Sequence, residues 1–323
     1  MRSWLITCVI SLSACGAPPP PISAPAATTA DAEPWLTSLD RDHPLVGKIW
    51  DVKASAFVDL NKAAARAATA RFVLLGEKHD NADHHRLQAR LLTELVKDGR
   101  HPAVVLEMLE IEQQPAVDSY LAQSGATAAG FGAALGWEKT SWPPFADYQP
   151  IFEVALKNKL PLKAGNIAQA DAKALVRQGV VALPSERAQQ LRLDRELSPD
   201  LQGPLLDELR ASHCGQLPES LLGPMALAQR ARDAQMARVL ESSSAADGAV
   251  LIAGGGHARL DRGAPYYLAI DEPSATVVSF VFREVRHADA QPQSYSADEG
   301  PFDYVWFTPR SSDDDPCASF KKR

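Results

Sequence analysis

The sequence predicts an α/β protein in which helices flank a mostly parallel central sheet. Short aliphatic runs alternate along the chain with longer segments that carry apolar residues at helical spacing, which is typical of such sheets. Two of these runs end in the same way: Gly76 is followed by His79 and Gly254 by His257. With 323 residues and 46% hydrophobic content, the chain can bury one large core.

The expected elements follow the chain in order, and each is an apolar run or an amphipathic segment. Strands are expected at 47–52, 71–76, 103–108, 161–166 and 249–254. Two later runs, 276–282 and 303–307, are expected at an edge of the sheet or antiparallel to it. Helices are expected at 60–70, 81–98, 111–123 and 147–159, and an α-rich insertion contributes 168–179, 184–195, 203–213 and 223–241.

The N-terminus has the pattern of a bacterial lipoprotein signal. A positive Met1-Arg2 precedes a short apolar stretch, and Leu12-Ser-Ala-Cys15-Gly resembles a lipobox. Residues 1–14 are therefore expected to be a signal peptide and Cys15 the lipidated residue, although a secretory signal with a chance cysteine is the alternative. Gly16, with no aspartate beside it, resembles the sorting pattern for the outer membrane, without indicating which face. Residues 15–34 form a Pro/Ala-rich tether and 35–323 a single domain.

Cysteine usage fits an exported protein. Cys8 leaves with the signal and Cys15 is lipidated, so Cys214 and Cys317 remain as an even pair in an oxidising compartment. A disulfide between them is expected, with two unpaired buried cysteines as the alternative. The formal charge of -7, without a Lys/Arg block among aromatic residues, gives no support for nucleic-acid binding.

Polar residues gather at the carboxyl ends of the expected strands, where open α/β sheets bind ligands. The set comprises Glu77, His79, Glu107, Asn166, His257 and Arg259. Buried charges at such places need partners or a ligand. These residues could act as ligands of a divalent metal, or as a base that activates water with a second group to orient it. A structural network of histidine–carboxylate pairs is the alternative.

Two further segments extend this prediction. His84 falls within the apolar stripe of helix 81–98 and is expected to face inward, either as a ligand or as a core residue, while His85 lies at the edge of the stripe. In helix 223–241, Arg232 and Asp233 belong to a polar patch that a surface ion pair would explain.

The aromatic segment 136–148 contributes Trp137, Trp142 and Tyr148. These residues would either wall a flat apolar ligand or pack a long loop against the core.

Six ordered motifs behind the lipobox carry a family resemblance. They read Gly-Glu-Lys-His-Asp-Asn-x-Asp-His-His-Arg-Leu-Gln, Val-Leu-Glu-Met-Leu, Trp-Pro-Pro-Phe-Ala-Asp-Tyr-x-Pro-Ile-Phe-Glu, His-Cys-Gly-x-Leu-Pro-Glu, Gln-Arg-Ala-Arg-Asp-x-x-Met-Ala and Ala-Gly-x-Gly-His-Ala-Arg. Together they resemble the ChaN-type haem-binding lipoproteins of the Tiki superfamily. The resemblance implies haem as the ligand, a role in iron uptake at the outer membrane, and haem held between two protomers of a homodimer.

The resemblance also implies a superfamily site of His79, Glu107 and His257, with Arg232 as a less secure match. Two departures stand out. Lys78 occupies a position where many relatives have glutamate, and no tyrosine, the ligand attributed to the family, occurs between Tyr148 and Tyr266.

The leading expectation is therefore an outer-membrane lipoprotein that binds haem for iron acquisition. The alternative is a metal-dependent hydrolase in which His79 and His257, with Glu77 and His84, hold a divalent ion. In that alternative Glu107 acts as general base, and Arg232 or Arg259 stabilises an oxyanion. A scaffold with a decayed site is a third possibility.

Overall fold

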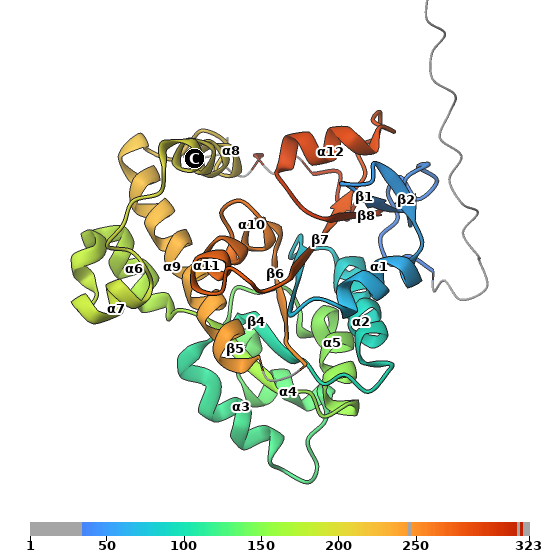
Figure 1. Ribbon diagram of the computed structural model, residues 1–323, viewed down its shortest axis with the longest axis horizontal. Coiled ribbons are helices and arrows are strands. Elements are labelled where there is room, and N and C mark those ends of the chain that lie inside the picture. The colour runs from blue at the N-terminus through green and yellow to red at the C-terminus, as the bar shows by residue number, and fades with distance from the viewer. Residues whose placement is uncertain (1–33, 245–246, 315–316, 319–323) are drawn as a thin grey trace, which may run out of the picture.

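The computed structural model describes residues 34–244, 247–314 and 317–318. Its strands are β1 (Ile49–Asp51), β2 (Ala56–Val58), β3 (Phe72–Glu77), β4 (Ala103–Glu110), β5 (Leu162–Asn166), β6 (Ala249–Gly254), β7 (Val277–Glu284) and β8 (Tyr304–Thr308). In this part of the chain they form one sheet in the order β2-β1-β8-β7-β3-β6-β4-β5 (Figure 1). The neighbours from β8 to β5 pair in parallel, while β1 pairs antiparallel with β8 and β2. The predicted α/β class is confirmed.

The expected edge or antiparallel placement is wrong for β7, whereas β8 pairs antiparallel with β1 on one side. β7 lies inside the sheet between β3 and β8 and runs parallel to both, and β8 lies between β7 and β1. The reason is burial on both faces: Val278 to Phe282 are all buried, which suits an interior parallel strand. The sequence reading also missed β2, a three-residue strand that completes a hairpin with β1 and shields this edge.

The sheet has helices on both faces (Figure 1). Successive residues of β3 alternate between the faces: Val73 and Leu75 belong to one apolar cluster, and Phe72 and Leu74 to the other. All four are fully buried. Burial of such a side chain is worth about 1.5–3 kcal/mol, so the central strands stabilise both layers.

The first face is covered by helices from the N-terminal half of the chain, whose apolar residues join the first cluster. They are α1 (Leu60–Ala68), α2 (Ala82–Val96), α3 (Gln114–Leu121), α4 (Ala128–Ala134) and α5 (Phe145–Lys157). The second face is covered by α6 (Gln169–Gln178), α7 (Ser185–Gln190), α9 (Glu219–Ser243), α10 (Gly255–Ala258), α11 (Ala264–Asp271) and α12 (Pro292–Glu299). The last three had not been predicted.

Helices α6, α7, α8 (Pro199–Ser212) and α9 confirm the predicted α-rich insertion between β5 and β6. They form a helical lobe on one side of the molecule, from which α9 returns to the sheet (Figure 1). α7 is shorter than expected because Arg192, with a positive φ of 53°, ends this helical region. α8 and α9 begin four residues before the expected starts and each contains an internal proline.

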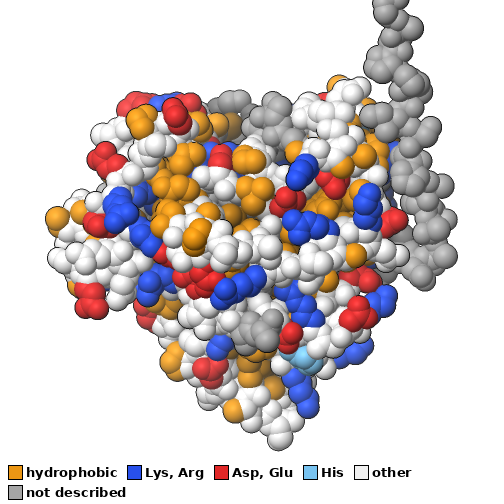
Figure 2. All heavy atoms as spheres, in the orientation of Figure 1, with side chains coloured by type: hydrophobic (Ala, Val, Ile, Leu, Met, Phe, Trp, Pro, Cys, Tyr) orange, Lys and Arg blue, Asp and Glu red, His pale blue; other side chains and the backbone are white. Residues whose placement is uncertain are grey.

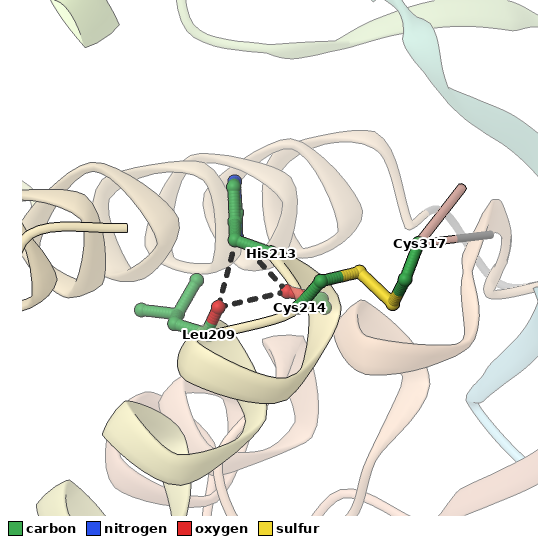
Figure 3. The surroundings of a disulfide bond; sticks show 5 residues. Leu209, His213, Cys214 and Cys317 are labelled. Atoms are coloured by element: carbon green, nitrogen blue, oxygen red, sulfur yellow. Dashed lines mark hydrogen bonds between the residues drawn. A yellow bond between two sulfur atoms is a disulfide. The ribbon is translucent and has the colours of Figure 1, made fainter. Parts of the chain in front are cut away.

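A disulfide joins Cys214, just after α8, to Cys317, beyond β8, with 5.5 Å between their Cα atoms (Figure 3). The predicted pairing is confirmed. No helix of the described ranges is both long enough and apolar enough to cross a membrane. The expected signal peptide, Cys8, Cys15 and the tether up to residue 33 lie outside these ranges.

Candidate functional site

The ends of three neighbouring strands bring the predicted polar residues together. β3 and β6 are in register, with Glu77 opposite Gly254, and the two histidine-bearing turns follow directly. On the other side of β6, Leu106 of β4 pairs with Ile252, which places Glu107 beside the same edge. His79, His257 and both carboxylates therefore lie at one end of the sheet, where parallel α/β folds bind ligands.

His257 is held between two buried carboxylates. Its Nδ1 lies 2.6 Å from Asp233 Oδ1 and its Nε2 lies 3.2 Å from Glu107 Oε1. The second oxygen of Glu107 accepts a 2.7 Å hydrogen bond from the backbone N–H of Gly254. Both ring nitrogens thus face acceptors, which favours the imidazolium form.

The electrostatics of this group follow from burial and pairing. Burial opposes protonation of His257, but the attraction of Glu107 and Asp233 prevails and raises its pKa to about 10. Burial likewise opposes ionisation of Glu107, yet the charge of His257 lowers its pKa to about 2. For Asp233 burial prevails, and its pKa rises to about 6. The net result is a buried cation shared by two acidic groups.

Glu77 is the centre of a second buried network. Its Oε1 lies 2.9 Å from His79 Nδ1 and accepts a 2.9 Å hydrogen bond from the Tyr148 hydroxyl, and its Oε2 lies 2.8 Å from His85 Nδ1. His85 Nε2 in turn lies 3.0 Å from the backbone oxygen of His79, to which it can donate. Burial opposes ionisation of Glu77, but the two histidines hold its pKa well below the usual range. Burial opposes protonation of both imidazoles, but pairing with Glu77 raises the pKa of each.

His79 is the accessible member of the two networks. Its side chain is 38% exposed, whereas that of Glu77 is fully buried. The ring passes over Gly254, where an added Cβ would lie 2.9 Å from His79 Cε1, so only glycine leaves room for it. Trp142 packs edge-on against the ring, with centroids 4.9 Å apart.

Several other predicted site residues lie elsewhere. His84 is a buried structural residue: it accepts a 2.9 Å hydrogen bond from the backbone N–H of Lys78, and its other nitrogen lies 2.9 Å from the Thr308 hydroxyl. Burial holds its pKa well below the usual value. Arg259 makes a two-pronged ion pair with Asp261.

The aromatic segment mostly packs against the core. Trp137 is buried and its indole N–H donates to the backbone oxygen of Pro143. Tyr148 is fully buried, and its ring packs against His85 with centroids 3.8 Å apart and the ring planes tilted by 32°. Trp142 alone among the three predicted pocket residues contacts a histidine at the cavity.

The sequence reading missed two members of the networks. His85, placed at the edge of the apolar stripe, is the histidine that faces Glu77. The predicted surface ion pair does not describe Asp233, which is 4% exposed and bonded to His257. Gln229, four residues earlier, also reaches His257 at 3.3 Å. The four-residue spacing places Gln229 and Asp233 on one helix face, and this spacing was the signal in the sequence.

A cavity of about 800 Å³ opens in front of the strand ends. His79, Glu107 and the turn from Gly254 to His257 form one side, and α6, α8 and α9 of the helical lobe form the other. The helical side contributes the apolar residues Ala172, Val176, Leu205, Leu209, Met225 and Ala228, interspersed with polar and charged side chains. The cationic residues that line the cavity are Lys78, which follows β3, and Lys173, Arg177 and Arg232 on the helical side.

The donor geometry does not support the expected divalent-metal site. Within residues 34–244, 247–314 and 317–318, no group of three or more His, Cys, Asp or Glu side chains is arranged to hold a metal ion. Both nitrogens of His257 face carboxylates, and His84 and Arg259 do not join the cluster.

The fold is similar to those of several solved structures. The chain is similar to a solved structure described as cofacial haem binding to ChaN of Campylobacter jejuni, with a TM-score of 0.64 and 21% identity over 80% of this chain and 95% of that one. It also matches the type III effector HopBA1, with a TM-score of 0.40, 12% identity, and coverage of 77% and 93%. No curated protein sequence matches the chain. The model of the family described as "Haem-binding uptake, Tiki superfamily, ChaN" matches residues 63–268, so the chain belongs to this family.

Proposed function

We propose that this protein binds haem in the cavity between the strand ends and the helical lobe, and so contributes to haem or iron acquisition. The observation that carries the proposal is the pairing of an apolar wall with cationic side chains in one cavity of about 800 Å³. This volume lies within the range of about 300–1,000 Å³ for small-molecule and cofactor sites. Membership of a haem-binding uptake family supports the same ligand.

The apolar wall suits the flat macrocycle of haem. Val176 of α6, Leu205 and Leu209 of α8, and Met225 of α9 line the cavity from three helices. Covering one face of a macrocycle in this way removes apolar surface from water, at about 25 cal/mol per Å².

The cationic residues suit the two propionates. Lys173 and Arg177 lie four residues apart on α6, so they share one helix face, and Arg232 approaches from α9. Guanidinium groups bind carboxylates in two-pronged geometry, which orients the ligand. On the face shown in Figure 2, apolar side chains are exposed below the position of α8, with both acidic and basic side chains around them.

Bound haem would supply an iron centre as the cargo of uptake. The family-implied tyrosine ligand is not available from Tyr148, because its buried hydroxyl donates to Glu77. The cofacial haems described for ChaN of Campylobacter jejuni suggest that two protomers of this protein would face each other across paired ligands.

Haem titration of the purified protein tests this proposal. We expect a Soret shift that saturates near one haem per chain, and sedimentation of the same samples should show a haem-dependent dimer. The double variant Lys173→Glu/Arg177→Glu should weaken binding about tenfold, or roughly 1.4 kcal/mol, because it places anions beside the propionates. Lys53→Glu/Lys157→Glu changes the charge equally at exposed residues outside the cavity and should leave the affinity unchanged. Absence of a Soret shift at micromolar haem would refute the proposal.

We further propose that the mature protein is attached to the outer membrane through acyl chains on Cys15, with residues 15–34 as a tether. The lipobox and Gly16 support this proposal. In a fractionation experiment, Cys15→Ser should move the protein from the membrane to the soluble fraction, whereas Cys8→Ser should not. Retention of the Cys15 variant in the outer membrane would contradict lipid attachment.

A further inference from the structure

We propose that His213 provides the axial ligand to the haem iron. The inference rests on the proposed haem function and deepens it. His213 directly follows α8 and lines the cavity from the helical lobe, on the side away from the strand-end networks. The sequence reading did not single out this histidine as a site residue.

The hydrogen bonds of His213 fix the tautomer that a metal needs. Its Nδ1 lies 2.8 Å from the backbone oxygen of Leu209, to which it donates, and 3.2 Å from the Ser212 hydroxyl (Figure 3). With the proton on Nδ1, the lone pair is on Nε2. Metal-ligating histidines commonly donate their other N–H to a backbone carbonyl, and imidazole is a common axial ligand of haem.

The other histidines of the cavity are engaged by acids. His257 faces Asp233 with Nδ1 and Glu107 with Nε2. His79 faces Glu77 with Nδ1, while its Nε2 and Glu107 Oε2 approach the same point above Gly254. Among the histidines that line this cavity in the described structure, His213 is the one with no carboxylate partner.

The chain around His213 is held in place. Cys214 has a positive φ of 57°, in the left-handed region that non-glycine residues rarely adopt, and its side chain is linked to Cys317. Gly215 donates a 2.9 Å hydrogen bond back to the oxygen of Arg210, which closes the end of α8. In Figure 3 the imidazole and the disulfide leave this turn in different directions, so the covalent link restrains the backbone without covering the ring. A ligand held on a restrained backbone loses little conformational freedom on binding.

Absorption and electron paramagnetic resonance spectra of the ferric haem complex test the assignment. His213→Gly should alter the Soret and spin-state signature and weaken haem binding by about tenfold or more, equal to at least about 1.4 kcal/mol. Added imidazole should restore the wild-type spectrum of this variant. His213→Tyr should bind haem with a spectrum of the tyrosinate type, and His101→Gly, at an exposed position outside the cavity, should behave as wild type. Far-ultraviolet circular dichroism of each variant verifies the fold.

The outcomes separate the two proposals. A wild-type protein with no Soret shift overturns both haem binding and the ligand assignment. If the wild type binds haem and His213→Gly keeps its spectrum and affinity, the assignment is overturned while haem binding stands. A change confined to His79→Ala or Met225→Leu would likewise overturn it, because the ligand would then be another residue of the cavity.

Discussion

Replacing Glu77 with alanine is expected to lower the free energy of unfolding by about 3–5 kcal/mol, the cost of breaking a buried ion pair. The Glu77 carboxylate lies between His79 and His85 and also accepts from Tyr148. Without it, the buried imidazole of His85 and the partly exposed imidazole of His79 lose the charge that holds their pKa values high, and a buried hydroxyl loses its acceptor.

Urea unfolding at pH 7, followed by circular dichroism, measures this effect. Glu153→Ala removes an exposed carboxylate of α5 and should stay within about 0.5 kcal/mol of wild type. The sign of the pH dependence is also fixed. Because the folded pKa of Glu77 lies below its ordinary value of 4.5, its contribution is present above pH 4.5 and is lost as the pH falls. Equal stability of the Glu77 and Glu153 variants at pH 7 would show that the network contributes nothing.

Reducing the Cys214–Cys317 disulfide is expected to cost about 2–5 kcal/mol of stability. The bond closes a loop with a sequence separation of 103 residues, and a loop of about 100 residues gives about 4.7 kcal/mol in the chain-entropy description. Reduction also frees the turn after α8 that carries His213, so haem affinity should fall with stability.

Thermal and urea unfolding with and without reductant measure the contribution of this bond. The double variant Cys214→Ala/Cys317→Ala should match the reduced wild type and should not respond to reductant, which controls for effects of the reductant itself. An unchanged unfolding midpoint on reduction, with two free thiols then counted in the denatured protein, would contradict the prediction.

The sequence was most informative where side chains follow buried strands. Glu77 and Glu107 end or continue aliphatic runs, and His79 and His257 follow glycines, so the parallel sheet alone brings all four to one edge. Predicting that placement requires only the direction of the strands and the order in which they pair in the sheet.

Helix orientation was harder to predict. His84 and His85 are adjacent, so their side chains differ by a rotation of about 100° around the axis of α2. The rotational position of the helix therefore decides which histidine meets Glu77 and which one packs in the core. Asp233 was misassigned for a related reason. Its helix packs against both the sheet and the helical lobe, so a polar patch on it is buried instead of solvated.

The helical side of the cavity could not be predicted from the sequence. The spacing of apolar residues identified the helices of the insertion but not how α6 and α8 would fold back over the strand ends. The shared cavity therefore could not be predicted for Lys173, Arg177 and His213, because they lie more than 90 residues from His79 along the chain.

An iron anomalous difference map from crystals of the haem complex tests the central claim most directly. A peak is expected inside the cavity between His79 and the helical lobe, with the Nε2 of His213 as the protein ligand to the iron. An iron peak outside this cavity, or haem bound only at another surface, would contradict the account.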